Sequence, residues 1–197
     1  MIEWSNGYSG ANIFGISATS TGCLAANGRS KIHFSADFGE TWQGILYGKS
    51  RSLGDGLAIK FLSHDDSNQT IIATDANNGH LYYSNNLGND WEIATGLVNI
   101  EHSLFEESFG IHIVEEASSN PMVLYAGYIQ SKIKGHDPHQ LDEIERSPGM
   151  YKSVVGGMSW FPMINGLPDE DYSRNISDIT VSSQNEEVVY ILSLIHI

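Results

Sequence analysis

An eight-residue motif recurs three times along the chain without internal gaps, so one structural unit is written at least three times. We call each copy an octet. The copies read SADFGETW, SNNLGNDW and SVVGGMSW, and each keeps Ser, Gly and Trp at its first, fifth and eighth positions. These shared residues are Ser35, Gly39, Trp42, Ser84, Gly88, Trp91, Ser153, Gly157 and Trp160. A short apolar or aromatic run precedes each octet, at 32–34, 81–83 and 150–152.

The residue types of the octet favour a β-hairpin. A side-chain oxygen at the third position is expected to accept a backbone N–H two residues on, and glycine at the fifth tolerates positive φ. The tryptophan then starts the returning strand and packs into the next layer. Asp37 and Asn86 supply the oxygen in the first two octets, whereas the third has Val155. Its turn is therefore expected to depend on Gly156 and Gly157 alone.

The first octet resembles the Asp box of the bacterial neuraminidase repeat, S-x-D-x-G-x-T-W, with Asp37 and Thr41 at the third and seventh positions. Similar repeats occur in sialidases, sortilin-type receptor ectodomains and two-propeller xyloglucanases, and the likeness spans about 13–191. The resemblance implies that each repeat is a four-stranded antiparallel blade of a β-propeller, with the Asp box joining the third and fourth strands. It also implies that the octet residues are structural and not catalytic.

Mapped onto the sequence, this resemblance predicts an all-β chain of about three and a half blades, at about 11–47, 57–97, 110–164 and 176–191. The expected strands are 13–18, 22–26, 31–35, 41–46, 57–62, 70–74, 80–84, 90–95, 111–116, 122–128, 149–153, 159–163, 176–182 and 187–191. A propeller closes with roughly four to eight blades, so we expect an incomplete one. Residues 192–197 resemble a translated sequencing adapter, and we expect them to be a non-native tail.

Composition excludes two partner classes. Asp and Glu number 24 against 10 Lys and Arg, which gives a formal charge of −14. A chain this acidic is expected to be repelled by nucleic acid phosphates. No apolar run reaches the ~18 residues of a membrane span, so no membrane insertion is expected in this segment. Phosphate-binding and redox motifs are absent from the sequence, and we expect no cofactor and no metal.

Charge differs between the two ends of the predicted blades. At the octet end, where the octet hairpins lie, we expect acidic residues without any Lys or Arg: Asp37, Glu40, Asp65, Asp66, Asp90, Glu115, Glu116, Glu186 and Glu187. The opposite end, which we call the loop end, is expected to hold eight of the ten basic residues. In the resembled family, ligands bind at that end. The candidate ligand-binding residues there are Arg51, Asp55, Asp75, His136, Asp137, His139, Arg146 and Arg174.

Three carboxylates are the candidate catalytic residues. Asp75 lies in ATDANNG, where the xyloglucanase resemblance implies a catalytic Asp in a T-D-x-G-G motif, although here the glycine pair is interrupted. A turn-forming role is the alternative for Asp75. Asp142 and Glu143 lie in an insertion at 130–148, which lengthens the third repeat. Glycoside hydrolysis requires two such carboxyl groups ~5–9.5 Å apart.

Two functions stay open at this point. The first is a secreted carbohydrate-active propeller related to glycoside hydrolases, which binds or hydrolyses a glycan at the loop end. The second is a non-catalytic propeller that serves as an adhesion or protein-interaction platform. The expected partner is accordingly a glycan or an extracellular protein, and the expected location is extracellular or at the cell surface. Fold alone does not choose between them.

Overall fold

The structure is a computed structural model that describes residues 13–18, 23–27, 31–37, 39–44, 59–61, 70–74, 80–86, 88–97, 110–129, 149–167 and 176–193. Within these ranges every regular element is a β-strand. The same ranges contain no helix that is long and apolar enough to cross a membrane.

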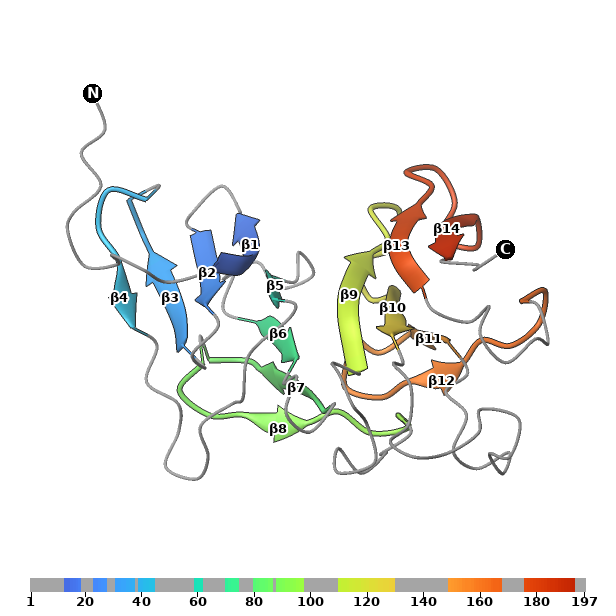
Figure 1. The fold of residues 1–197 in the computed structure, drawn as a ribbon, viewed down its shortest axis with the longest axis horizontal. Coiled ribbons are helices and arrows are strands. Elements are labelled where there is room, and N and C mark those ends of the chain that lie inside the picture. The colour runs from blue at the N-terminus through green and yellow to red at the C-terminus, as the bar shows by residue number, and fades with distance from the viewer. Residues whose placement is uncertain are drawn as a thin grey trace, which may run out of the picture.

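The strands form four antiparallel sheets in chain order (Figure 1). The first sheet contains β1 (Ile13–Ala18), β2 (Cys23–Asn27), β3 (Lys31–Ser35) and β4 (Gln43–Gly44). The second contains β5 (Ile59–Phe61), β6 (Ile71–Thr74), β7 (Leu81–Ser84) and β8 (Glu92–Ile93). The third contains β9 (Gly110–Glu116), β10 (Leu124–Ile129), β11 (Met150–Ser153) and β12 (Phe161–Pro162). The fourth contains β13 (Ile176–Val181) and β14 (Val189–Ser193).

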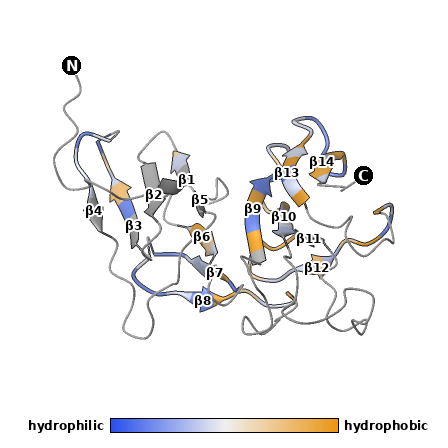
Figure 2. Cartoon of the chain, in the orientation of Figure 1, coloured by the Kyte–Doolittle hydropathy of each residue, from blue (hydrophilic) through white to orange (hydrophobic). Residues whose placement is uncertain are grey.

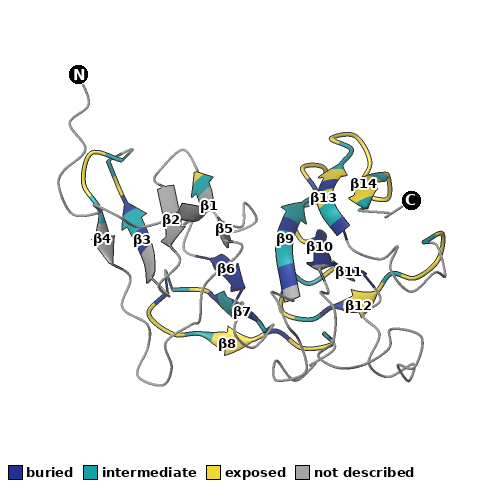
Figure 3. Cartoon of the chain, in the orientation of Figure 1, coloured by how far each residue is buried: buried dark blue, intermediate teal, exposed yellow. Residues whose placement is uncertain are grey.

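In each complete sheet the strands are neighbours in the order in which they occur in the chain. The sheets follow one another along an open arc, with the first strand of each sheet toward the inside (Figure 1). The outer strands β8 and β12 are exposed, whereas every residue of β6 is buried (Figure 3). This arrangement of consecutive four-stranded antiparallel sheets is that of a partial β-propeller, as the repeat predicts.

The outermost strands of the second and third sheets are shorter than the sequence predicts. Expected strands at 90–95 and 159–163 are reduced to two residues each in β8 and β12. Edge position explains the difference, because an outer strand bonds to one neighbour only, and Pro162 has no N–H to donate. The last strand, β14, runs to Ser193, and its Leu192 and Ser193 pair with β13. The expectation that 192–197 is a non-native tail stays a prediction.

Apolar side chains of the described residues are buried between consecutive sheets, in two clusters. Figure 2 colours the strands by hydropathy, with apolar residues in orange. One cluster joins the second and third sheets and contains Ile72, Leu81, Ala94, Ile111, Val114, Leu124, Ala126, Tyr128, Tyr151 and Trp160. Another joins the third and fourth sheets and contains Ala117, Val123, Tyr125, Met150, Ile176 and Ile179. The second, third and fourth sheets are therefore stabilised by their neighbours, as expected for a repeat architecture.

Candidate functional site

The first octet forms a turn in which both Ser35 and Asp37 act as caps. The Ser35 hydroxyl oxygen accepts the Gly39 N–H at 2.8 Å and donates to Asp37 Oδ1 at 2.7 Å. Asp37 Oδ1 accepts the Thr41 N–H at 2.8 Å, and the Thr41 hydroxyl donates to Asp37 Oδ2. The third-position oxygen therefore bonds an amide four residues on, not two as expected, because Ser35 already occupies the nearer amides.

The second octet exchanges the roles of its third and seventh positions. Asn86 replaces the aspartate, and its Oδ1 accepts the Asp90 N–H at 2.9 Å. Its amide nitrogen donates to Asp90 Oδ2 at 3.0 Å, so the carboxylate now lies at the seventh position and the donor at the third. Ser84 still caps Gly88 at 2.8 Å. The pair of substitutions in the sequence is thus mutually compensating.

The third octet has no third-position oxygen, yet its turn does not depend on glycine alone. The Ser153 oxygen accepts the N–H groups of Gly157 at 2.9 Å and Val155 at 3.3 Å. The expectation that Gly156 and Gly157 alone form this turn is therefore wrong. The Trp160 indole N–H donates to the Gly157 carbonyl at 2.8 Å, as Trp42 does to Gly39 at 3.1 Å.

Hydrogen bonding also sets the charge state of the first octet. The Ser35 hydroxyl and then the Thr41 hydroxyl and amide lower the pKa of Asp37 to about 2. Each of these groups donates to the ionised carboxylate and so favours it. At neutral pH the Asp37 carboxylate is therefore ionised, and it accepts hydrogen bonds from groups of its own turn.

The third octet also contacts the second sheet. The Thr95 N–H donates to the Met158 carbonyl at 3.0 Å, and the Thr95 carbonyl accepts the Trp160 N–H at 2.9 Å. At Gly157 an added Cβ would lie 2.4 Å from Ile72 Cδ1, so the hairpin backbone touches the buried face of β6. This octet is consequently part of the junction between two sheets.

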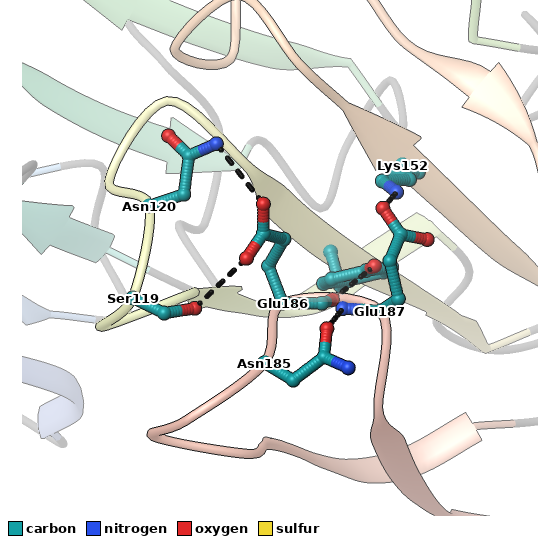
Figure 4. Close-up of polar contacts among 7 residues, drawn as sticks. Ser119, Asn120, Lys152, Asn185, Glu186 and Glu187 are labelled. Atoms are coloured by element: carbon teal, nitrogen blue, oxygen red, sulfur yellow. Dashed lines mark hydrogen bonds and ion pairs between the residues drawn. The ribbon is translucent and has the colours of Figure 1, made fainter.

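A polar cluster joins the third and fourth sheets at the octet end (Figure 4). Glu186, in the β13–β14 turn, accepts from Ser119 Oγ at 3.1 Å and from Asn120 Nδ2 at 3.3 Å. Lys152 Nζ lies 2.6 Å from Glu187 Oε1, with the lysine side chain 13% exposed. Partial burial acts to lower the pKa of Lys152, but the hydrogen bonds and charges of Glu187 and Tyr125 together outweigh it, so the pKa is raised.

This cluster corrects the predicted charge separation. We expected no Lys or Arg at the octet end, but Lys152 of β11 pairs there with Glu187. The lysine ammonium also lies 5.5 Å from the Tyr125 ring centroid, in a cation–π contact. The strand register explains the miss: Lys152 precedes Ser153 directly, and the long side chain crosses to the next sheet.

The structure describes the strand ends that lie at the loop end, but the candidate ligand-binding and catalytic residues there lie outside the described residues. β6 ends at Thr74 and β7 begins at Leu81, while Ser84 and the octet lie at the other end of the same pair. The candidates outside the described residues are Arg51, Asp55, Asp75, His136, Asp137, His139, Asp142, Glu143, Arg146 and Arg174. Of the predicted site residues, the structure therefore describes those of the octets.

Two buried polar groups were not identified from the sequence. The hydroxyl of Tyr128, near the loop end of β10, is buried and has no hydrogen-bond partner among the described residues, and burial raises the pKa of Tyr128. His112 of β9 lies within 3.4 Å of the Ser177 carbonyl of β13 through Nε2, and burial lowers its pKa. A lone Tyr or His in an apolar strand gives no sequence signal. No group of three or more His, Cys, Asp or Glu suited to a metal ion occurs among the residues that the structure places.

No protein-family model and no curated protein sequence matches the chain. Solved structures do match its fold. An ancestral GH74 enzyme is 17% identical with a TM-score of 0.63, over 92% of this chain and 22% of that one. The GH74 enzyme of Niastella koreensis is 16% identical with a TM-score of 0.55, over 92% of this chain and 21% of that one.

YCF48 from Cyanidioschyzon merolae is 16% identical with a TM-score of 0.57, over 96% of this chain and 50% of that one. The chain thus spans about a fifth of the length of the GH74 enzymes and half that of YCF48. At these identities the likeness establishes the fold and not the chemistry. The closer assignment of the octets to the Asp-box family stays a prediction from the sequence. What the comparisons support for this chain is the fold of a partial β-propeller.

Proposed function

We propose that the chain forms part of a carbohydrate-active propeller, related to glycoside hydrolases, that binds a glycan at the loop end. The observation that carries this proposal is that polar side chains at the octet end form hydrogen bonds within their own turns or between neighbouring sheets. Asp37, Asn86 and Ser153 are engaged in their own turns, and Glu186 and Lys152 join neighbouring sheets. Groups committed to structure in this way are poor ligands, so binding is assigned to the opposite end.

The fold of the chain supports the choice of ligand. Two of the structures it resembles over 92% of its length are GH74 enzymes. On this proposal the sugar hydroxyls are bound by the mixed charges of the loop end, with Arg51, Asp55, Arg146 and Arg174 among them. Cleavage requires a carboxylic acid and a carboxylate on either side of the glycosidic bond, and Asp75, Asp142 and Glu143 are the candidates. The proposed setting is extracellular or at the cell surface.

The test compares a loop-end carboxylate with an octet-end carboxylate. The chain is screened on a glycan array, and binding of the best oligosaccharide is then measured for Asp75→Asn and, as the matched control, Asp37→Asn. We expect Asp75→Asn to weaken binding by about tenfold, the loss of a charged hydrogen bond of roughly 1.5 kcal/mol. Asp37→Asn should leave affinity unchanged. Equal losses for the two variants, or no glycan bound at all, would contradict the proposal.

A protein-interaction platform is the second candidate, and four exposed apolar side chains within one short segment favour it. Val154, Met158, Phe161 and Ile164 are between 46% and 53% exposed, around the third octet and β12. The corresponding octet positions of the second sheet are polar, with Asn85 and Asn89. Exposed apolar groups that gather in one place commonly mark a protein contact. Glycan binding that survives Phe161→Asp, together with loss of a protein partner, would separate the two functions.

A further inference from the structure

A β-bulge places His112 near the loop end of β9, the first strand of the third sheet. Ile111 pairs with Tyr128 and Ile113 pairs with Gly127, so His112 is an extra residue with no residue opposite it on β10. A bulge interrupts the regular alternation of side chains along a strand and redirects the side chain that it carries. The neighbours of the His112 imidazole are therefore set by this bulge.

The bulge directs His112 to the first strand of the fourth sheet. β9 and β13 lie side by side (Figure 1), and His112 Nε2 is 3.4 Å from the Ser177 carbonyl oxygen. The strands are closely packed here, because a Cβ added at Gly127 would lie 2.6 Å from Ile113 Cγ2 and 2.9 Å from Ile176 Cγ2. The imidazole thus lies in a tight junction between the third and fourth sheets.

The contact with Ser177 determines which ring nitrogen of His112 carries the hydrogen. A carbonyl oxygen only accepts, so Nε2 must donate, and in the neutral ring Nδ1 is then an acceptor. Nδ1 is buried and has no hydrogen-bond partner among the described residues. A proton added at Nδ1 therefore brings a positive charge and a second donor into the junction, where neither is compensated by a hydrogen bond.

The surroundings of His112 favour its neutral form. Burial is the largest influence on the pKa of His112 and lowers it. The carbonyls of Ser177 and Gly127 and the carboxylate of Asp178 act in the opposite direction, but they do not outweigh burial. Asp178 is exposed, so solvent and salt screen its charge. The junction is consequently more favourable when the imidazole is uncharged.

The other titratable groups along this junction lie away from the bulge. Tyr128 of β10 packs into the cluster between the second and third sheets, and Glu115 pairs with Tyr125 farther toward the octet end. At that end hydrogen bonding lowers the pKa of Glu186 and raises the pKa of Lys152, so both keep their charge through mildly acidic pH. The polar cluster therefore still joins the two sheets in the pH range in which histidine titrates.

We propose that His112 is an acid-sensitive contact that holds the loop end of the junction between the third and fourth sheets. Below about pH 6.5, protonation favours a state in which β13 has moved away from β9 and the imidazolium is hydrated. The polar cluster at the octet end limits this opening to the loop end. The proposal concerns the junction itself and does not depend on the proposed glycan binding.

The first sheet offers a matched control variant. The pairing of β1 with β2 is irregular between Ile13 and Gly15, so Phe14 is the extra residue of that bulge. His112→Phe gives the third sheet the residue type of the first sheet's bulge, and it cannot take up a proton. His112→Gln is the second variant, because its amide keeps an N–H for the Ser177 carbonyl and does not titrate. Thermal unfolding establishes that each variant is folded.

The experiment measures amide hydrogen exchange of the full chain and of both variants at pH values of about 7.5 and 5.5. Rates are expressed as protection factors, which removes the intrinsic pH dependence of exchange. Amides of β13 report on the junction, and amides of β6, which is buried in the second sheet, serve as the internal reference. Imidazole ¹⁵N NMR identifies the ring nitrogen that carries the hydrogen at neutral pH.

We expect the protection of β13, relative to β6, to fall by about threefold to tenfold on acidification of the wild type. The upper limit corresponds to an imidazole that stays neutral in the closed junction about one pH unit below its ordinary pKa. The fall should be absent from His112→Phe and His112→Gln, and the hydrogen should be on Nε2. If His112→Phe does not fold, His112→Gln decides.

Three results would overturn the proposal. The first is a loss of β13 protection in acid that persists in the folded variants, which assigns it to another group. The second is an equal change, or no change, in β13 and β6 of the wild type, because the junction then does not respond separately to acid. The third is a neutral imidazole with its hydrogen on Nδ1, which is incompatible with donation to the Ser177 carbonyl.

Discussion

The first and third octets have the same turn but are stabilised differently. Both use a buried serine to cap the glycine amide, and both tryptophans donate to that glycine's carbonyl. In the first octet the turn is completed by the Asp37 carboxylate. In the third it is completed by burial, because Trp160 is 2% exposed and lies in the core between two sheets.

The difference shows that the motif specifies a shape and not a single source of stability. Trp42 is half-buried, and the first octet holds its turn with charged and polar contacts near the surface. The third octet can dispense with the acid because the second sheet covers it, through Thr95 and Ile72. A consensus sequence therefore does not tell which copy matters most to the fold.

The largest expected effect is at the tryptophans. Trp160→Ala should lower the free energy of unfolding by ~3–5 kcal/mol, because it removes a fully buried aromatic and leaves a cavity between two sheets. Trp42→Ala should cost less, about 1–2 kcal/mol, since part of that side chain is already in water. Urea denaturation of both variants measures the gap. Losses of equal size would show that burial between sheets does not distinguish the two octets.

The octet glycines provide a comparison with matched backbone strain. Gly39 has φ of 95° and Gly157 has φ of 87°, so an alanine at either position costs roughly 1–2 kcal/mol from the left-handed backbone. At Gly39 the new Cβ would lie 3.7 Å from Trp42, an ordinary contact. At Gly157 it would lie 2.4 Å from Ile72 Cδ1, in a side chain with 0% exposure.

We therefore expect Gly157→Ala to be more destabilising than Gly39→Ala by a further ~1–3 kcal/mol from overpacking. The double variant Gly157→Ala with Ile72→Val tests the cause, because a shorter side chain at 72 makes room for the new methyl. Recovery of stability in the double variant, relative to Ile72→Val alone, assigns the excess to this contact. If stability is not recovered in the double variant, the excess destabilisation of Gly157→Ala does not come from the contact with Ile72.

Loss of the two capping serines should change different quantities: the free energy of unfolding for Ser153, and also the pKa of Asp37 for Ser35. Ser153→Ala leaves the Gly157 and Val155 amides without their acceptor in a fully buried position, at a cost of about 1–3 kcal/mol. Ser35→Ala removes the equivalent cap and also the hydroxyl that donates to Asp37, so it should raise the pKa of that carboxyl. Chemical denaturation and NMR titration measure the two effects. A Ser153→Ala variant as stable as the wild type would contradict the shared capping role.

The sequence predicts the strands and hairpins of this chain better than it predicts the side-chain contacts between sheets. Regular spacing of Ser, Gly and Trp indicates the hairpins, and alternation of apolar runs with turn residues indicates the inner strands, because both depend on local chemistry. The reach of Lys152 to Glu187 and the burial of Trp160 rather than Trp42 depend on which sheet lies alongside, and no local pattern encodes that. The candidate ligand residues, Asp75 and Arg51 among them, lie outside the described residues and stay predictions.

The smallest effect in the comparison concerns pH. With a folded pKa of about 2 against an ordinary value of 3.8, Asp37 stabilises the folded chain above pH ~4, and that contribution is lost as pH falls toward 2. The sign follows from the lowered pKa: the unfolded chain binds the proton first, so acid favours unfolding. Asp37→Asn should reduce stability at pH 7 and leave it equal to the wild type near pH 2. The third octet has Val155 at this position, so Val155→Ala should show no such pH dependence relative to the wild type. An Asp37 pKa near 4 by carboxyl NMR titration would contradict the polar stabilisation of the first octet and leave burial as the difference between the two hairpins.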